Sequence, residues 1–250
     1  MRRLFACLVV LTAVAVYPFV PRLQAVTTLF SAQFTVATAD ADIAGYGVDD
    51  DATFIGTACA EWLDTSGGNA IFWYNAGDTA YGQANSNSHR IAYLCTPLPT
   101  SDDYNISLKR TAGTGDDDVS AIIFGRSTDD YCVVWWRGSA AAAEDIGARL
   151  WSGGSPTTLG TDVDAGMANG DTVYVHIRSG GVVTVDKGAS ALISFTNSAC
   201  VATREWGFGF GNFTNGTDDI SNAVEVDDLL VTQEDAVSTV RRGPLLGVLP

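Results

Sequence analysis

YNISLKR (residues 104–110), VSAIIFGR (119–126), DYCVVWWRG (130–138) and IGARLWSG (146–153) begin a series of short β-strand candidates. The series continues with DTVYVHIRS (171–179), GVVTVDKG (181–188), SALISF (190–195), EWGFGFGN (205–212) and NAVEVDDLLVTQED (222–235). Gly, Asn, Asp and Ser separate the candidates, and such residues favour turns. Strands at this spacing, with few helix signals, predict an all-β fold of two antiparallel sheets, a sandwich or jelly roll.

Two strand candidates alternate cleanly between apolar and polar or small residues. In residues 171–178, Val173, Val175 and Ile177 are expected on one face, with Tyr174, His176 and Arg178 on the other. In residues 205–212, the aromatic side chains are expected in the core and glycines on the opposite face. A glycine face indicates either close packing of a neighbouring segment or the approach of a ligand.

Other strands are predicted before and within this series. Residues 26–36, 69–74 and 89–94 are strand candidates, and a polar loop is expected between the last two. Residues 133–136 (VVWW) are apolar on both faces, so that strand is either covered on both sides or exposes a Trp.

The amino-acid composition limits the functions that the protein can have. The chain has 250 residues and 46% hydrophobic content, enough for one large domain. Its 29 acidic against 14 basic residues give a net charge of −15, which disfavours nucleic-acid binding. Most acidic residues form short clusters between strand candidates, which is typical of soluble loops. The alternative is a Ca²⁺ site, for which Asp116, Asp117 and Asp118 are the candidates, so calcium is a possible cofactor.

Both ends of the chain are apolar. Residues 1–25 have a basic start and an apolar run broken by Pro18, which predicts either a secretory signal cleaved near Ala25 or a retained assembly arm. The run is too short and too interrupted for a stable membrane span. Residues 237–250 form a second apolar, proline-containing tail beyond the last strand. The sandwich itself is expected over residues 26–236.

Four of the five cysteines lie in the predicted domain. Cys59, Cys95, Cys132 and Cys200 are compatible with two disulfides in any of three pairings, or with four separately buried thiols. No pair has the spacing of a zinc site.

The strand order resembles the concanavalin A-like (laminin G-like) jelly-roll superfamily. The resemblance covers about Phe30 to Glu234 and is carried by residues 115–138, 148–161, 169–188, 205–212 and 222–231. It implies two curved antiparallel sheets, a Ca²⁺ ion on a rim loop in some members, and frequent binding of glycans or proteins. Related modules occur in phage and viral surface proteins.

This superfamily includes glycosidases, whose chemistry needs two carboxylates on either side of one bond. Its retaining glucanases resemble this chain in part, since Glu225-Val226-Asp227 matches the first half of their E-x-D-x-(x)-E strand. Leu229 and Leu230 stand where the third acid belongs, and the strand is the last of the domain rather than a central one. We therefore expect no enzyme, and we interpret the Asp227-Asp228 doublet as a bulge.

Two classes of function remain. The first is a structural subunit of a virion or similar extracellular assembly, of decoration, spike or fibre type, with its apolar tails contacting itself or other structural proteins. The second is a secreted carbohydrate-binding module that stacks sugars on exposed aromatic residues. The candidates for such stacking are Trp136, Trp151 and Tyr174, although burial in the core is an alternative for each. The two apolar tails favour the assembly subunit, on a virion or extracellular surface.

Overall fold

Fifteen β-strands and two short 3-10 helices make up the regular structure of the described residues. The computed structural model describes residues 26–32, 62–64, 70–75, 79–84, 89–94, 98–112, 119–127, 130–137, 145–153, 155–211, 213 and 224–234. The strands are β1 (Val26–Ala32), β2 (Trp62–Asp64), β3 (Ala70–Asn75), β4 (Thr79–Ala84), β5 (His89–Leu94), β6 (Tyr104–Ala112), β7 (Val119–Ser127), β8 (Asp130–Arg137), β9 (Ile146–Ser152), β10 (Ser155–Thr158), β11 (Thr172–Arg178), β12 (Val182–Lys187), β13 (Ser190–Thr196), β14 (Trp206–Gly211) and β15 (Val224–Glu234). The helices are η1 (Ser179–Gly181) and η2 (Ser198–Val201).

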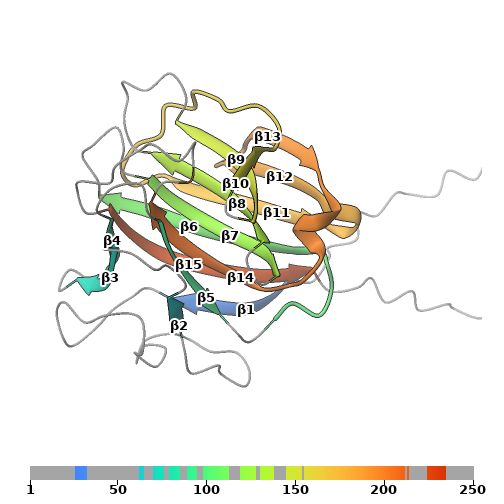
Figure 1. Ribbon diagram of the computed structural model, residues 1–250, viewed down its shortest axis with the longest axis horizontal. Coiled ribbons are helices and arrows are strands. Elements are labelled where there is room, and N and C mark those ends of the chain that lie inside the picture. Colours follow the sequence, from blue (N-terminus) through green and yellow to red (C-terminus); the bar gives the residue numbers. More distant parts are fainter. Residues whose placement is uncertain are drawn as a thin grey trace, which may run out of the picture.

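The strands form two antiparallel sheets that face each other as a sandwich (Figure 1). Sheet A has eight strands in the order β13-β12-β11-β6-β15-β4-β3, with β1 paired to β15 beside β4. Sheet B has seven strands in the order β10-β9-β8-β7-β14-β5-β2. The all-β sandwich predicted from the sequence is confirmed, and the architecture is consistent with a jelly roll. None of the described residues forms a helix long and apolar enough to cross a membrane.

Apolar side chains from the two sheets meet between them. On β11 the predicted alternation is confirmed, since Val173, Val175 and Ile177 are fully buried while their neighbours reach the opposite face. On β14 the aromatic residues are buried as expected, and the Trp206 ring packs on Phe30 of β1 with 5.1 Å between centroids. Because β1 belongs to sheet A and β14 to sheet B, this contact fixes which face of each sheet is the core face.

The outer face of sheet B is also covered. All four residues of the VVWW segment of β8 are buried, so this strand is covered on both sides. Gly207 and Gly209 of β14 are buried as well, which supports close packing against that strand rather than the approach of a ligand. Sheet A therefore offers the more accessible strand face among the described residues.

Two features of the sheets differ from the prediction. The segment expected to be a polar loop contains β4, which pairs with β3 in sheet A, while β5 lies in sheet B. β15, expected to be the last strand rather than a central one, lies between β6 and the pair β1/β4. Residues 33–36 of the first strand candidate lie outside the described residues. Position in the sequence does not determine position in a sheet, because the last strand of an antiparallel fold can pair between earlier ones.

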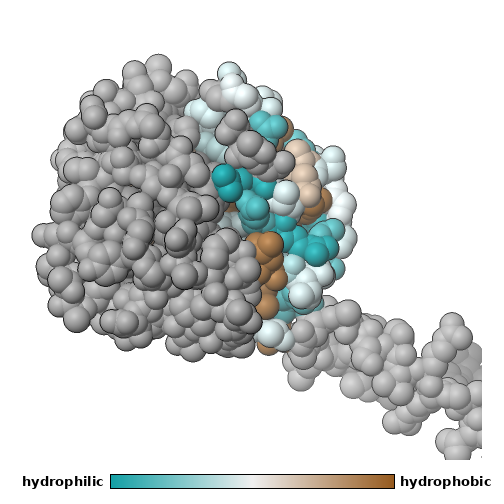
Figure 2. All heavy atoms as spheres, turned by 60° about the horizontal axis from the view of Figure 1, so that its bottom comes forward, coloured by the Kyte–Doolittle hydropathy of each residue, from teal (hydrophilic) through white to brown (hydrophobic). Residues whose placement is uncertain are grey.

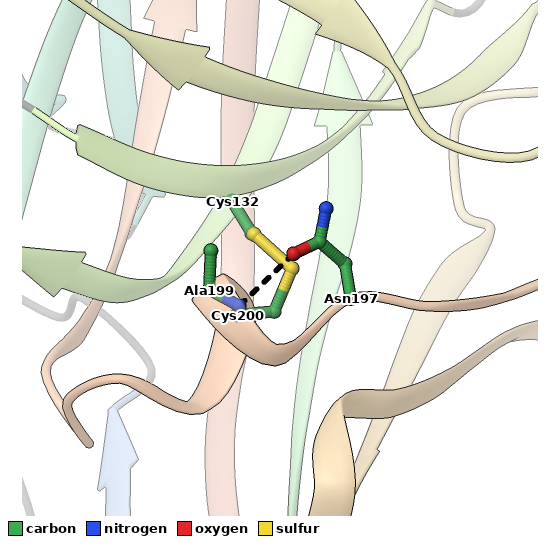
Figure 3. Close-up of a disulfide and its surroundings, with 4 residues drawn as sticks. All are labelled: Cys132, Asn197, Ala199 and Cys200. Atoms are coloured by element: carbon green, nitrogen blue, oxygen red, sulfur yellow. Dashed lines mark hydrogen bonds between the residues drawn. A yellow bond between two sulfur atoms is a disulfide. The ribbon is translucent and has the colours of Figure 1, made fainter.

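A disulfide joins sheet B to the segment that leads into β14. Cys132 of β8 is bonded to Cys200 of η2, and both are fully buried (Figure 3). The Asn197 side chain accepts a hydrogen bond from the Ala199 amide and so caps η2. Gly125, at φ +64°, lies against the Cys200 carbonyl, where a Cβ atom would overlap it. Cys59 and Cys95 lie outside the described residues.

Tyr104 carries a fully buried hydroxyl for which no described residue is a hydrogen-bond partner. Burial raises its pKa above the ordinary value of 10.0, and the negative charge of Asp102 acts in the same direction. The folded protein therefore keeps the phenol proton at alkaline pH values at which the unfolded chain has lost it. Stability should fall with pH in this range, because the folded state then binds more protons.

We expect the Tyr104→Phe variant to be at least as stable as the parent at neutral pH, by up to about 1 kcal/mol, because it removes an unpaired buried hydroxyl. Its advantage should grow by about 1.4 kcal/mol per pH unit above about pH 10. Urea unfolding from about pH 8 to about pH 11 measures both effects. If the free energy of unfolding falls equally with pH in the two proteins, Tyr104 does not cause the loss of stability at alkaline pH.

Candidate functional site

Tyr174 is the most exposed aromatic residue among those whose side-chain exposure is described, a set that excludes β2 to β5. The alternation of β11 directs it away from the core, and 36% of its surface is accessible. Its strand neighbours are Ser107 of β6 on one side and Asp186 of β12 on the other. Tyrosine offers a rigid apolar ring with a polar tip, so an exposed one is suited to binding a ligand that has both characters.

Two shallow hollows adjoin Tyr174 on the outer face of sheet A. The central hollow, about 270 Å³, is lined by Ser31, Ser107, Thr172, Tyr174, Asp228 and Leu230, which come from β1, β6, β11 and β15. The lateral hollow, about 320 Å³, is lined by Gly170, Asp171, Thr172, Tyr174, Lys187 and Gly188. Thr172 and Tyr174 line both, so the two hollows adjoin each other at these side chains, and together we call them the cleft.

The hollows exist because small residues stand between large ones. Across the sheet, Tyr174 pairs in register with Ser107, Ser107 with Leu230, and Leu230 with Ser31. The short Ser107 side chain, 7% exposed, therefore leaves a depression between the Tyr174 and Leu230 side chains. In the lateral hollow, Gly188 leaves open space where a side chain would stand. The shape of the cleft follows directly from this pattern.

An ion pair adjoins each hollow. Lys109 Nζ donates to Asp228 Oδ2 at 3.0 Å, and this hydrogen bond, followed by the carboxylate charge, raises the pKa of Lys109. Lys187 Nζ contacts Asp171 Oδ2 at 2.7 Å and donates to the Gly166 carbonyl at 2.8 Å. Both lysines stay partly exposed, at 33% and 27% of the side chain. The three N–H groups of Lys187 are taken by Asp171 and two backbone carbonyls, and Lys109 lies beside the central hollow without lining it. The charged groups that these pairs leave open to the hollows are therefore the carboxylates of Asp228 and Asp171.

A bulge in β15 places Asp228. The register of β15 against β6 shifts between Asp227 and Leu230, and Asp228 has φ +50°, in the left-handed region. The predicted bulge at the Asp227-Asp228 doublet is confirmed. An extra residue at a bulge redirects a side chain, and here it brings Asp228 to Lys109 and into the lining of the central hollow.

A polar row lies beside the cleft on the same face. The His176 ring contacts Asp186 Oδ2 through Nε2 at 3.0 Å and Asn105 Oδ1 through Nδ1 at 2.8 Å. Arg178 donates to the same Asn105 oxygen at 2.9 Å and pairs with Glu234 at 2.5 Å. These bonds fix the side chains in one arrangement, so the row forms a rigid edge for the cleft.

The other two aromatic candidates are not available for stacking. Trp136 is fully buried because it faces the core side of β8, opposite Ile146 of β9. Trp151 keeps only 6% of its surface and stacks on Tyr131 at 6.2 Å between centroids. Of the three aromatic candidates for sugar stacking, only Tyr174 therefore remains, because both tryptophans are buried against other residues.

The remaining predicted residues divide into two groups. Asp116, Asp117 and Asp118, the calcium candidates, lie outside the described residues, and the described part of the chain contains no group of three or more His, Cys, Asp or Glu suited to a metal ion. Glu225 and Asp227 lie on the outer face of sheet A, flanking the buried Val226. Leu229 is buried in the core and Leu230 lines the central hollow.

The protein is similar in fold to several solved structures. The sequence matches no protein-family model, and no curated protein matches it. A chain from a structure of endo-acting O-glycanases of the human gut microbiota superimposes with a TM-score of 0.50 at 10% identity, over 84% of this chain and 100% of that one. At this identity the similarity shows the fold alone.

Two further solved structures superimpose less closely. The carbohydrate-binding module CBM66 from Bacillus subtilis has a TM-score of 0.40 at 13% identity, over 71% of this chain and 89% of that one. The β-glucanase of Bacillus licheniformis has a TM-score of 0.47 at 11% identity, over 84% and 98%.

Proposed function

We propose that this protein is a carbohydrate-binding module whose ligand lies in the cleft on the outer face of sheet A. The observation that carries the proposal is Tyr174, an exposed aromatic ring bordered by two polar hollows. A sugar has an apolar ring face and a rim of hydroxyl groups. Tyr174 matches the first, and the Asp228 and Asp171 carboxylates together with Ser31, Ser107 and Thr172 match the second.

One face of the described surface has few hydrophobic patches. In Figure 2 its residues are mostly hydrophilic or of intermediate hydropathy, with hydrophobic residues in small patches among them. Homodimer interfaces and the buried core of other protein interfaces are usually more apolar than the rest of the surface. The assembly-subunit hypothesis depends on residues 1–25 and 237–250, which lie outside the described residues, and it stays a prediction.

Binding without hydrolysis is the form of the proposal that the residues support. A glycosidase needs two carboxylates placed across the scissile bond. Glu225 and Asp227 share the outer face of sheet A, and β15 is a central strand, unlike the sequence-based expectation. The third acid of the glucanase pattern is nevertheless replaced by Leu229, which is buried, and by Leu230. Product analysis with each glycan that binds, for the parent and for Glu225→Gln, tests this point directly.

Tyr174→Ala should lower affinity for a bound glycan about tenfold or more, because it removes the apolar platform from the cleft. The ligand is first selected on an array of neutral and acidic glycans, and its affinity is then measured by titration calorimetry. Tyr174→Phe should bind nearly as well as the parent, since the ring is kept.

Leu98→Ala is the matched control. Leu98 is 37% exposed, close to the exposure of Tyr174, and it lines a separate hollow of about 370 Å³ beside η2. This variant should bind like the parent. If Leu98→Ala lowers affinity while Tyr174→Ala does not, the site lies beside η2 and the proposal for the cleft fails. An array on which no glycan binds would refute the carbohydrate-binding function itself.

A further inference from the structure

The central hollow is lined by polar side chains that have unused hydrogen-bonding groups. These residues are Ser31, Ser107, Thr172, Tyr174 and Asp228. Among the described residues, none of the four hydroxyl groups makes a hydrogen bond, and the Asp228 carboxylate makes one through Oδ2 alone. Polar groups that leave water on folding are usually paired within the protein. The hollow therefore gathers donors and acceptors that a ligand can pair.

Ser107 is the most buried of these polar residues. Only 7% of its surface is exposed, yet its hydroxyl has no hydrogen-bond partner among the described residues. It lies in register between Tyr174 of β11 and Leu230 of β15, in the depression between their side chains. An unpaired hydroxyl at a nearly buried position costs free energy until another group satisfies it. The Ser107 hydroxyl is therefore placed to contact a ligand in the hollow.

The polar row beside the cleft shows the opposite behaviour on the same three strands. Asn105 of β6 accepts hydrogen bonds from Arg178 of β11 and donates one to Thr232 of β15, at 2.9 and 3.2 Å. The ring of His176, also on β11, contacts the same Asn105 oxygen at 2.8 Å. The side chains of this row are thus paired with one another, two residues along each strand from the hollow. Free hydroxyl groups are therefore a local property of the hollow and not of the whole sheet face.

The backbone at Asp228 gives an independent reason to assign it a function. Asp228 is the one non-glycine residue with positive φ in the described part of the chain. Such residues are uncommon and concentrate at binding and catalytic sites. Lys109 holds Oδ2 of the carboxylate at 3.0 Å, while 44% of the Asp228 side chain stays exposed. The bulge and the lysine together fix the carboxylate and leave Oδ1 as an acceptor for a ligand.

The charges around the cleft disfavour a charged ligand of either sign. The one lining cation, Lys187, has all three N–H groups occupied, so an anionic ligand would meet the Asp228 and Asp171 carboxylates without a free cationic donor. The net charge of −15 adds to this repulsion. A cationic ligand would meet the Lys109 ammonium, which already occupies Oδ2 of Asp228. The hollow is therefore suited to an uncharged ligand that supplies hydroxyl groups.

We infer that the central hollow binds one uncharged sugar ring, and that Asp228 and Ser107 determine its specificity through hydrogen bonds to two hydroxyl groups of that ring. Asp228 Oδ1 accepts from one sugar hydroxyl, and the Ser107 hydroxyl pairs with the other. The volume of about 270 Å³ lies just below the usual range for pockets of drug-sized ligands, which agrees with a single ring. This inference rests on the proposed carbohydrate-binding function and adds to it the charge of the ligand and two contact residues.

Matched pairs of sugars test the charge of the ligand. The probes are the methyl glycosides of glucose, galactose and mannose, each compared with the methyl glycoside of its uronic acid, and ligand-observed NMR measures their affinities. At least one uncharged glycoside should bind, about tenfold or more tightly than its uronate. Equal or stronger binding of the uronate would overturn the uncharged class. If no methyl glycoside binds although a longer glycan of the array does, a single ring is not the unit of recognition and the inference fails.

Two substitutions test the contact residues. Asp228→Asn keeps the size of the side chain and tolerates the left-handed backbone, so it should fold like the parent and lower affinity for the bound methyl glycoside about tenfold. Its preference for the uncharged sugar over the uronate should also shrink. Ser107→Ala should lower affinity about fivefold without lowering the urea concentration of unfolding, because the hydroxyl has no partner in the described part of the protein. Ser194→Ala is the matched control, since Ser194 is an exposed serine of β13 that lines neither hollow.

The outcomes separate this inference from the proposed function. If Tyr174→Ala loses binding while Asp228→Asn and Ser107→Ala bind like the parent, the specificity contacts are wrong and the carbohydrate-binding cleft stands. If Ser107→Ala loses affinity and stability together, the hydroxyl has a structural role and not the proposed one. If Tyr174→Ala also binds like the parent, the proposed site fails together with the inference.

Discussion

Removal of the Cys132–Cys200 disulfide is expected to lower the free energy of unfolding by about 4 kcal/mol. The two cysteines are 68 residues apart in the sequence, so the bond restricts a long loop of the unfolded chain. In the folded state it ties β8 to η2, and both side chains are fully buried. A loss of this size is a large part of the stability of an ordinary domain.

The Cys132→Ala/Cys200→Ala double variant tests this expectation by urea unfolding, with the parent measured in the presence and absence of a reductant. The reduced parent and the double variant should unfold at similar urea concentrations, both well below the oxidised parent. The single variant Cys200→Ala should match the double variant, because either change removes the bond. A double variant within about 1 kcal/mol of the oxidised parent would show that the bond contributes little to stability.

Much of the fold could be predicted from the sequence because alternation is a local property. The pattern of β11 predicts that Tyr174 and the buried valines lie on opposite faces, and the structure confirms it. Strand order is different, because it depends on pairings between distant segments. The last strand in the sequence, β15, therefore lies at the centre of sheet A without any local signal that predicts it.

The candidate site was predicted in part for the same reason. Tyr174 could be found from the pattern of one strand, whereas the burial of Trp136 and Trp151 depends on what packs over β8 and β9. The lysine–aspartate pairs join residues 119 and 16 positions apart in the sequence, and only the sheet register brings them together. The scarcity of lysine was a possible signal for these pairs. The chain has only two lysines, and both lie in strands that pair with the strand of Tyr174.

A second large effect is expected at a buried ion pair on sheet B. Arg149 of β9 donates to Asp162 through both terminal nitrogens, and their side chains are only 8% and 10% exposed. The Arg149 guanidinium also lies 5.4 Å from the centroid of the Trp135 ring. Asp162 packs so closely over Gly147 of β9 that a Cβ atom there would overlap its carboxylate. The pair is thus enclosed by packed groups, with little water to replace either partner.

Asp162→Leu should therefore lower the free energy of unfolding by about 3–5 kcal/mol, because it leaves the Arg149 charge buried and uncompensated. Arg149→Met should cost a similar amount through the unpaired Asp162 carboxylate. The double variant Arg149→Met/Asp162→Leu should recover most of the loss, since apolar groups of similar volume remove both charges together. Urea unfolding of the four proteins gives the coupling energy of the pair. Additive losses in the double variant would contradict this account, because they would show that neither charge depends on the other for its stability in the folded protein.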